Sequence, residues 1–179
     1  YCVAMAVESG PVSGDTADEG ARVRACVLGR FEVRVADRPL ARADWQRVSA
    51  ERLVKLLLVT RGHVLPRAVA TELLWPDLDP ATGSATFRKA LHYAHRALDG
   101  TGVLASNGPT ACLVASRLDL DLDRLLDAFA TIDATHDDRP AADAVETILE
   151  LGAEDLLPDD LYEEWLAGPR ERLRSRWQA

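Results

Sequence analysis

Residues 80–98 have the sequence PATGSATFRKALHYAHRAL, which is the part of the chain most informative about its fold. At 3.6 residues per turn, one stripe of this stretch is apolar and the opposite side carries basic and imidazole groups. The apolar stripe consists of Phe87, Leu91, Ala94 and Leu98, and the other side of Arg88, Lys89, His92, His95 and Arg96. Asp79 suits the N-cap and Pro80 suits the first helical position. The stretch predicts an amphipathic helix whose cationic face is either an ordinary solvated surface or a binding surface.

A hairpin is predicted directly after this helix. Residues 103–105 and 111–115 have the composition of two short strands, and Asn107-Gly108 is a strong turn signal between them. Pro109 and Thr110 indicate a loop longer than two residues. A cationic helix followed by a small hairpin is typical of a winged helix, in which the helix enters the major groove of DNA and the hairpin contacts the flanking backbone.

Strands and two further helices are predicted ahead of the cationic helix. Residues 23–27 and 31–35 alternate between apolar and other side chains as strands do, residues 37–39 suit a turn, and a short third strand is expected near residues 45–48. Ser49 is the expected N-cap of a helix over residues 50–61. Pro66 opens a helix over residues 67–75, with Val69 and Leu73 among the residues expected to face inward. With the cationic helix, this order forms a helix-turn-helix arrangement.

From residue 118 onward the apolar pattern becomes helical. Leu122, Leu125, Leu126 and Phe129 form one stripe, Pro140 opens a helix with Ile148 and Leu149 on its apolar side, and Pro169 opens a last helix. That last helix reaches Ala179 without a capping residue, so we expect the native chain to continue beyond it. Residues 1–20 are small, acidic and rich in Gly, Ser and Pro, and we expect them to be disordered.

The charge is distributed unevenly along the chain. The net charge is −8, yet residues 21–117 carry 15 bases and 8 acids, whereas residues 118–179 carry 6 bases and 17 acids. A basic middle joined to an acidic end is the asymmetry expected when one domain meets a polyanion. No apolar run is long enough to span a bilayer, no signal peptide is apparent, and three widely spaced cysteines favour a cytoplasmic protein with reduced thiols.

Several motifs in order resemble the Streptomyces antibiotic regulatory protein (SARP) family. They are VRACVLGRFEVRVADRPL at residues 23–40, LVKLLLVTRGHVLPRAVATELLWPDLDP at 53–80, ATFRKALHYAHRAL at 85–98, LDLD at 118–121, LLP at 156–158, YEEW at 162–165, and the pair Arg172-Leu173 in the last helix. The resemblance implies an α+β fold: an OmpR-type winged helix over residues 21–117, followed over residues 118–179 by the start of an all-α, tetratricopeptide-like bacterial transcriptional activation domain. It also implies a transcriptional activator that binds direct repeats in double-stranded DNA, as a dimer or head-to-tail pair, and recruits RNA polymerase through its sigma factor.

The expected DNA contacts lie mainly on the cationic helix. We expect Arg88, Lys89, His92 and Arg96 to contact DNA, since arginine pairs with guanine and lysine with phosphate. Ser84 and Thr86 could bind phosphates near the helix start, by their hydroxyls or through exposed helix N–H groups. Three further arginines, Arg117, Arg47 and Arg67, either contact flanking phosphates or are ordinary surface charges. Of these, we expect Arg117 to contact DNA.

Other functions find less support in the sequence. His92 and His95 are three residues apart but have no third metal ligand at a recognisable spacing, and the aspartates of residues 119–123 lack the glycine and glutamate of a calcium loop. No phosphate-binding loop or catalytic motif is present, so we expect no cofactor and no enzymatic activity. The alternative to a DNA reader is a winged-helix module for protein interaction or autoinhibition in a larger ATPase-linked regulator, which the uncharged hairpin favours.

Overall fold

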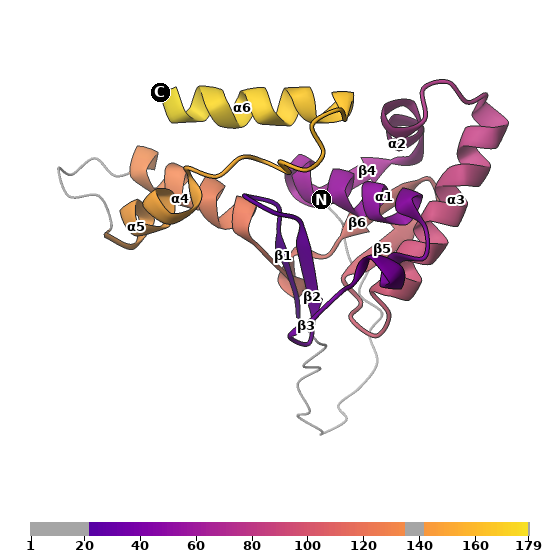
Figure 1. Ribbon diagram of the computed structural model, residues 1–179, viewed down its shortest axis with the longest axis horizontal. Helices are drawn as coiled ribbons and strands as arrows, with labels where there is room; N and C mark the ends of the chain where they lie inside the picture. The colour runs from indigo at the N-terminus through magenta and orange to yellow at the C-terminus, as the bar shows by residue number, and fades with distance from the viewer. Residues whose placement is uncertain (1–21, 135–141, 179) are drawn as a thin grey trace, which may run out of the picture.

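The computed structural model describes residues 22–134 and 142–178, so the leader predicted at residues 1–20 lies outside the described residues, as does Pro140 (Figure 1). In chain order the strands are β1 Val23–Cys26, β2 Glu32–Val35, β3 Arg38–Pro39, β4 Val64–Pro66, β5 Leu104–Asn107, β6 Thr110–Leu113 and β7 Leu118–Leu120. The α-helices are α1 Val48–Val59, α2 Arg67–Leu74, α3 Pro80–Ala97, α4 Asp121–Ala134, α5 Ala142–Leu151 and α6 Ala167–Gln178. Short 3₁₀ turns occupy Arg42–Trp45, Arg61–His63, Ala115–Arg117 and Glu164–Leu166.

The strands form two sheets. The first has the order β3-β2-β1-β7, with β1 antiparallel to β2 and parallel to β7. The second has the order β4-β6-β5 and consists of antiparallel pairs. Ala25 pairs with Val33 across the first sheet, and both are buried, which places the apolar side of the β1–β2 hairpin in the core.

Helix α1 is the centre of the molecule. Every side chain from Leu53 to Val59 is buried, including the lysine at position 55. A helix that is buried on all sides needs partners all around it, and α1 contacts α2, α3 and strand β6. Lys55 is accommodated by ion pairs of 2.8 Å from its Nζ to Glu51 and to Asp160.

The acidic end of the chain packs on the same core. Helices α4 and α5 pack together, and Figure 1 shows them on the side of the molecule opposite α3, with α6 lying across the top. The backbone N–H of Leu157 donates to the carbonyl of Val27 at 2.7 Å, and Leu28 forms an isolated bridge with Leu156. No described helix combines the length and the apolarity needed to cross a bilayer.

The strand predictions were partly wrong. The third strand is β3 at Arg38–Pro39, where a turn was expected, and the turn itself is Ala36-Asp37, both with positive φ. Residues near Trp45 form a 3₁₀ turn and not a strand. In the second hairpin Asn107 pairs with Thr110, so the loop has only two residues, Gly108 and Pro109.

Each predicted helix has a counterpart among the described residues, but several details differ. Helix α1 begins at Val48, so Ser49 lies inside it and is not its N-cap. Val69 and Leu73 of α2 were expected to face inward but are 42% and 40% exposed. The buried residues of this short helix are Ala70 and Leu74. In the acidic end, Leu126 and Leu149 are exposed as well, and residues 118–120 form strand β7 before α4 begins.

Candidate nucleic-acid interface

Helix α3 has the cap and most of the buried seam that its sequence predicts. The Asp79 carboxylate accepts hydrogen bonds from the N–H groups of Ala81 and Thr82 at 3.0 and 3.1 Å, and Pro80 occupies the first turn. Phe87, Ala94 and Leu98 of the predicted stripe are buried, whereas Leu91 is only partly buried. Ala90, outside the predicted stripe, is fully buried as well, and α3 packs against α1 and α2. This packing fixes which side of α3 faces outward.

The four side chains predicted to contact DNA share the outward side of α3. Arg88, Lys89, His92 and Arg96 are all exposed. None of the three cations among them forms an ion pair with another described residue, whereas cations elsewhere do, such as Arg24 with Asp119 and Arg38 with Asp44. Figure 1 shows α3 at the edge of the molecule, away from α4, α5 and α6. The face therefore presents positive charge that no described carboxylate neutralises through an ion pair.

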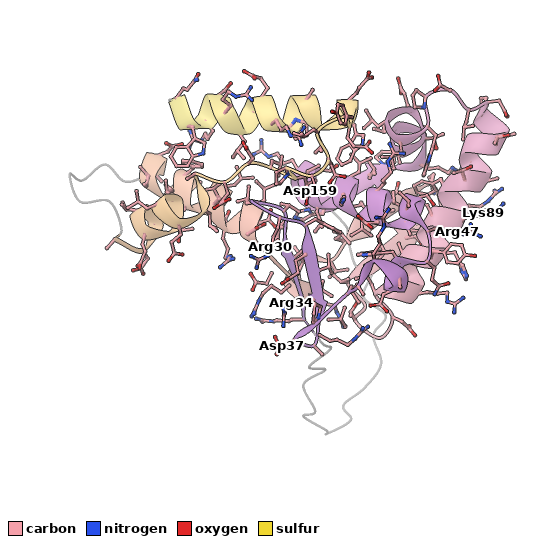
Figure 2. All side chains as sticks on the ribbon, viewed as in Figure 1. Arg30, Arg34, Asp37, Arg47, Lys89 and Asp159 are labelled. Atoms are coloured by element: carbon pink, nitrogen blue, oxygen red, sulfur yellow. The ribbon has the colours of Figure 1, made fainter. Side chains whose placement is uncertain are left out.

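A groove of about 710 Å³ runs between this face and the start of α1. It is lined by Arg47, Ser49, Ala85, Thr86, Arg88, Lys89, His92 and Tyr93. The lining carries three cationic side chains and no carboxylate. Figure 2 shows Arg47 and Lys89 beside one another at the outer edge of the molecule. Such a groove attracts an extended anion by its shape and its charge.

Arg47 and Tyr93 also line the groove, although helical periodicity alone does not identify them as groove residues. The guanidinium of Arg47 lies over the Tyr93 ring, 5.6 Å from its centroid, and this contact joins the residue before α1 to the middle of α3. The sequence offered Arg47 only as one of several basic residues outside α3. Its place on the groove depends on how α1 packs against α3, which is a tertiary feature.

The remaining residues predicted to contact DNA are less exposed than the four side chains above; they are Ser84, Thr86 and Arg117. Ser84 and Thr86 are half-buried, and the Thr86 hydroxyl donates to the carbonyl of Thr82 at 2.9 Å. The Asp79 cap occupies two of the helix N–H groups that were expected to be open to phosphate. Arg117 does not line the groove, and its guanidinium donates to the carbonyl of Thr101 at 3.0 Å.

The β5–β6 hairpin, which we call the wing, has no charged residue between Leu104 and Leu113. It pairs with β4, and the backbone N–H of Arg67 donates to the carbonyl of Pro109 at 2.6 Å. The wing is therefore attached to the start of α2. Its contacts with a nucleic acid would have to come from backbone groups and uncharged side chains.

The histidines of α3 differ from one another in their surroundings. His92 is exposed, and its ring is T-shaped to the Tyr93 ring, with 5.3 Å between the two centroids. His95 is half-buried, and burial, with a smaller contribution from His92, lowers its pKa below the ordinary value. Within residues 22–134 and 142–178, no three His, Cys, Asp or Glu side chains are grouped so as to hold a metal ion.

Comparison with known proteins gives a fold likeness. No family model matches the chain, and no curated protein matches it. Among solved structures, the chain is similar to Mycobacterium tuberculosis EmbR in complex with a low affinity phosphopeptide, with a TM-score of 0.62 and 17% sequence identity. The match covers 88% of this chain and 43% of the EmbR chain, so the chain spans less than half the length of that protein.

The likeness confirms the predicted fold class. The α+β arrangement of N-terminal strands, three helices and a hairpin, followed by helices, is shared with EmbR. At this level of identity the comparison concerns the fold alone.

Proposed function

We propose that this chain is the sequence-specific DNA-binding part of a SARP-type transcriptional activator. The observation that carries the proposal is the groove beside α3, whose lining combines cations from α3 and from the residue before α1 with no carboxylate. Arg88 and Arg96 would contact base edges, with about 1–3 kcal/mol of discrimination for each good bidentate pair with guanine. Lys89 and Arg47 would contact phosphates, which set the register of the protein on the duplex.

The rest of the proposal follows from the sequence resemblance. Residues 21–117 would form the DNA-binding domain and residues 118–179 the first part of an activation domain that recruits RNA polymerase through its sigma factor. The protein would act in the cytoplasm, in pairs on direct repeats, and would carry out no chemistry of its own. The fold shared with EmbR supports a regulator of this general kind.

The test is selection of bound sequences from a pool of random duplex DNA, followed by titration of the selected site. The wild type should enrich a short repeated motif, and Arg88→Ala with Arg96→Ala should abolish the enrichment. A matched control, Arg30→Ala with Arg174→Ala, removes the same charge from exposed positions outside the groove and should retain the motif. The affinity of the wild type should also fall steeply as salt rises, because phosphate contacts release counterions.

The uncharged wing favours a second candidate function. A winged helix whose hairpin offers no cation could serve protein interaction or autoinhibition in a larger ATPase-linked regulator. That function predicts little DNA affinity at any salt concentration. Absence of enrichment at low salt, with the protein folded by circular dichroism, would contradict DNA binding and favour this alternative.

A further inference from the structure

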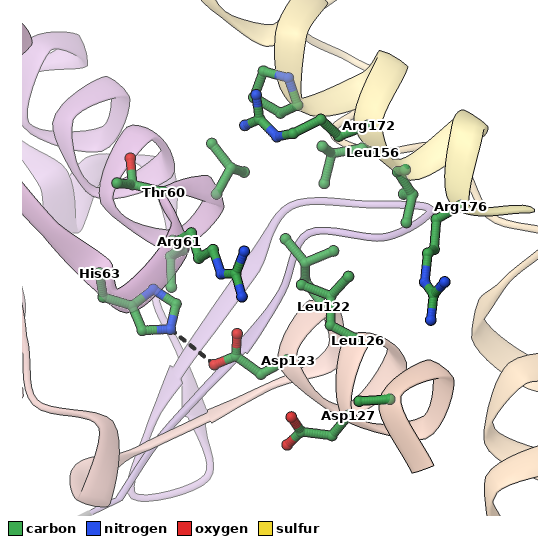
Figure 3. A pocket seen from close by; sticks show the side chains of 15 residues that line it. Thr60, Arg61, His63, Leu122, Asp123, Leu126, Asp127, Leu156, Arg172 and Arg176 are labelled. Atoms are coloured by element: carbon green, nitrogen blue, oxygen red, sulfur yellow. Dashed lines mark hydrogen bonds and ion pairs between the residues drawn. The ribbon is translucent and has the colours of Figure 1, made fainter. Parts of the chain in front are cut away.

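A second cavity, of about 490 Å³, lies between the end of α1, helix α4 and helix α6 (Figure 3). Its apolar lining comes from all three helices and from the segment before α6, namely Leu58, Val59, Leu122, Leu126, Leu156 and Leu173. Of these, Leu126 is 42% exposed, and the others are buried. Interiors of proteins are close-packed, so a space of this size is too large to be an ordinary packing defect. It lies in the range of small-molecule pockets.

Three arginines line the cavity. Arg61 comes from the turn after α1, and Arg172 and Arg176 come from successive turns of α6 (Figure 3). Neither the Arg61 nor the Arg172 side chain forms a hydrogen bond or ion pair with another described residue. Arg176 pairs with Asp133 outside the cavity lining and lies over the Phe129 ring, 5.3 Å from its centroid. Two guanidinium groups are therefore available to a ligand.

The carboxylates at the cavity cancel only part of this charge. Asp123 is held by His63, with 2.8 Å between its Oδ2 and the imidazole Nε2, and Figure 3 shows this contact. Asp127 is exposed on α4 and makes no ion pair with another described residue. A ligand with an anionic end would meet Arg61 and Arg172 and keep that end away from Asp127. The apolar lining would then cover the rest of the ligand.

We infer that this cavity binds a small organic anion with an apolar body, held by Arg61 and Arg172 at its charged end and by the leucines of α1, α4 and α6 along its body. A guanidinium group donates two parallel hydrogen bonds to two oxygens of a carboxylate, sulfonate or phosphate group. Binding therefore depends on both the charge of the ligand and the geometry of its anionic group. The site is distinct from the groove beside α3, since the two share no lining residue. Because α1 belongs to the predicted winged helix and α4 and α6 to the acidic end, the ligand would hold the two parts together.

The inference can be tested with 8-anilinonaphthalene-1-sulfonate, an anion with an apolar body whose fluorescence rises on binding. We expect saturable binding to the folded protein and a rise in the midpoint of thermal unfolding, because a ligand that binds only the folded state stabilises it. The neutral analogue N-phenyl-1-naphthylamine, which has the same rings without the sulfonate, should bind at least about tenfold more weakly, since it lacks the charge-assisted hydrogen bonds.

Variants locate the binding. Arg61→Gln with Arg172→Gln should weaken the sulfonate by about tenfold or more and leave the neutral analogue nearly unchanged. The control is Arg174→Gln on the same helix, whose side chain pairs with Glu171 and does not line the cavity. Leu126→Trp places a large ring in the cavity from an exposed position and should block both probes without loss of folding.

Backbone amide spectra complete the test. Shifts on adding the sulfonate should concentrate in residues 58–63, α4 and α6. Equal binding to the wild type and to both cavity variants would overturn the inference, as would amide shifts that lie elsewhere. Both outcomes are independent of whether the protein binds DNA.

Discussion

Asp121 connects the acidic end of the chain to the segment that follows strand β1. Its side chain is buried, and its carboxylate accepts hydrogen bonds from the N–H groups of Val27, Leu28 and Leu122 at 2.8–3.0 Å. Burial raises the pKa of Asp121, and the three backbone donors oppose that rise. Asp121→Ala leaves these donors without an acceptor, so we expect the free energy of unfolding to fall by about 3 kcal/mol in urea titrations.

The control for this prediction is the neighbouring Asp119. Its carboxylate pairs with Arg24 at 3.1 Å on the surface, and exposed pairs of this kind contribute less than about 1 kcal/mol. Asp119→Ala should therefore be nearly neutral. Equal destabilisation by both substitutions would contradict the role given to Asp121.

The free energy of unfolding should depend on pH through His63. Its side chain is buried, and the hydrogen bond between Nε2 and Asp123 raises its pKa above the ordinary value of about 6.5 despite the opposing effect of burial. A raised pKa in the folded state stabilises the protein fully below the unfolded value, and this stabilisation is lost as pH rises through the folded value. The difference in unfolding free energy between the wild type and Asp123→Asn should thus be larger at about pH 6 than at about pH 9.

Two measurements check the His63 prediction. Urea unfolding at the two pH values gives the free energies, and a titration of the His63 ring signals by NMR gives the pKa directly. His92→Gln serves as the control, because His92 is exposed and lacks a carboxylate partner among the described residues. An unchanged difference between the two pH values would show that His63 and Asp123 do not act as a pair.

At the scale of elements, the sequence predicts what local periodicity encodes and misses what depends on distant partners. Helix α3, with its Asp79 cap and Phe87 seam, is evident from one stretch of sequence. Strand β4, residues Val64–Pro66, is not, because three residues give no period and the strand exists only through its pairing with β6. The same limit explains why Arg47 was not singled out as a residue of the groove.

The crossing of α2 and α3 gives a prediction at this scale. A Cβ placed on Gly83 would lie 2.3 Å from Cγ2 of Thr71, so the two helices approach closely at this point. Gly83→Ala gains about 1 kcal/mol of helix propensity but forces the crossing apart or turns Thr71, at a cost of about 1–3 kcal/mol. We expect a lower midpoint of thermal unfolding and weaker DNA binding.

Removing the obstructing methyl group should reverse the effect. Thr71→Ala combined with Gly83→Ala leaves room for the new Cβ, so the double variant should be more stable than Gly83→Ala alone. The two changes should be non-additive by about 1 kcal/mol in a double-mutant cycle. Simple additivity would indicate that the crossing adjusts without strain.

At the scale of the whole molecule, the two charge regions point to a division of roles. The cationic face lies on α3, and Glu146 and Glu150 are exposed on α5 at the other side of the molecule (Figure 1). We propose that the acidic end stays away from DNA and meets protein. Glu146→Lys with Glu150→Lys should therefore leave the affinity for a selected DNA site unchanged or raise it, as measured by fluorescence anisotropy. A large loss of affinity would show that α5 takes part in DNA binding.

The packing of the acidic end on the winged helix leads to a prediction about folding. Strand β7 completes the sheet of β1, and Leu156, Leu157 and Leu166 are buried in the same core as Val27 and Leu28. Parts of a chain that share a sheet and a core lose each other's contacts when either unfolds. We therefore expect residues 22–178 to unfold in one cooperative transition, although the sequence divides into two predicted domains at residue 118. Calorimetry checks this, because the calorimetric and van't Hoff enthalpies agree for a two-state transition. Two separate transitions, with the fragment ending at Arg117 unfolding cooperatively by itself, would establish that the domains fold independently.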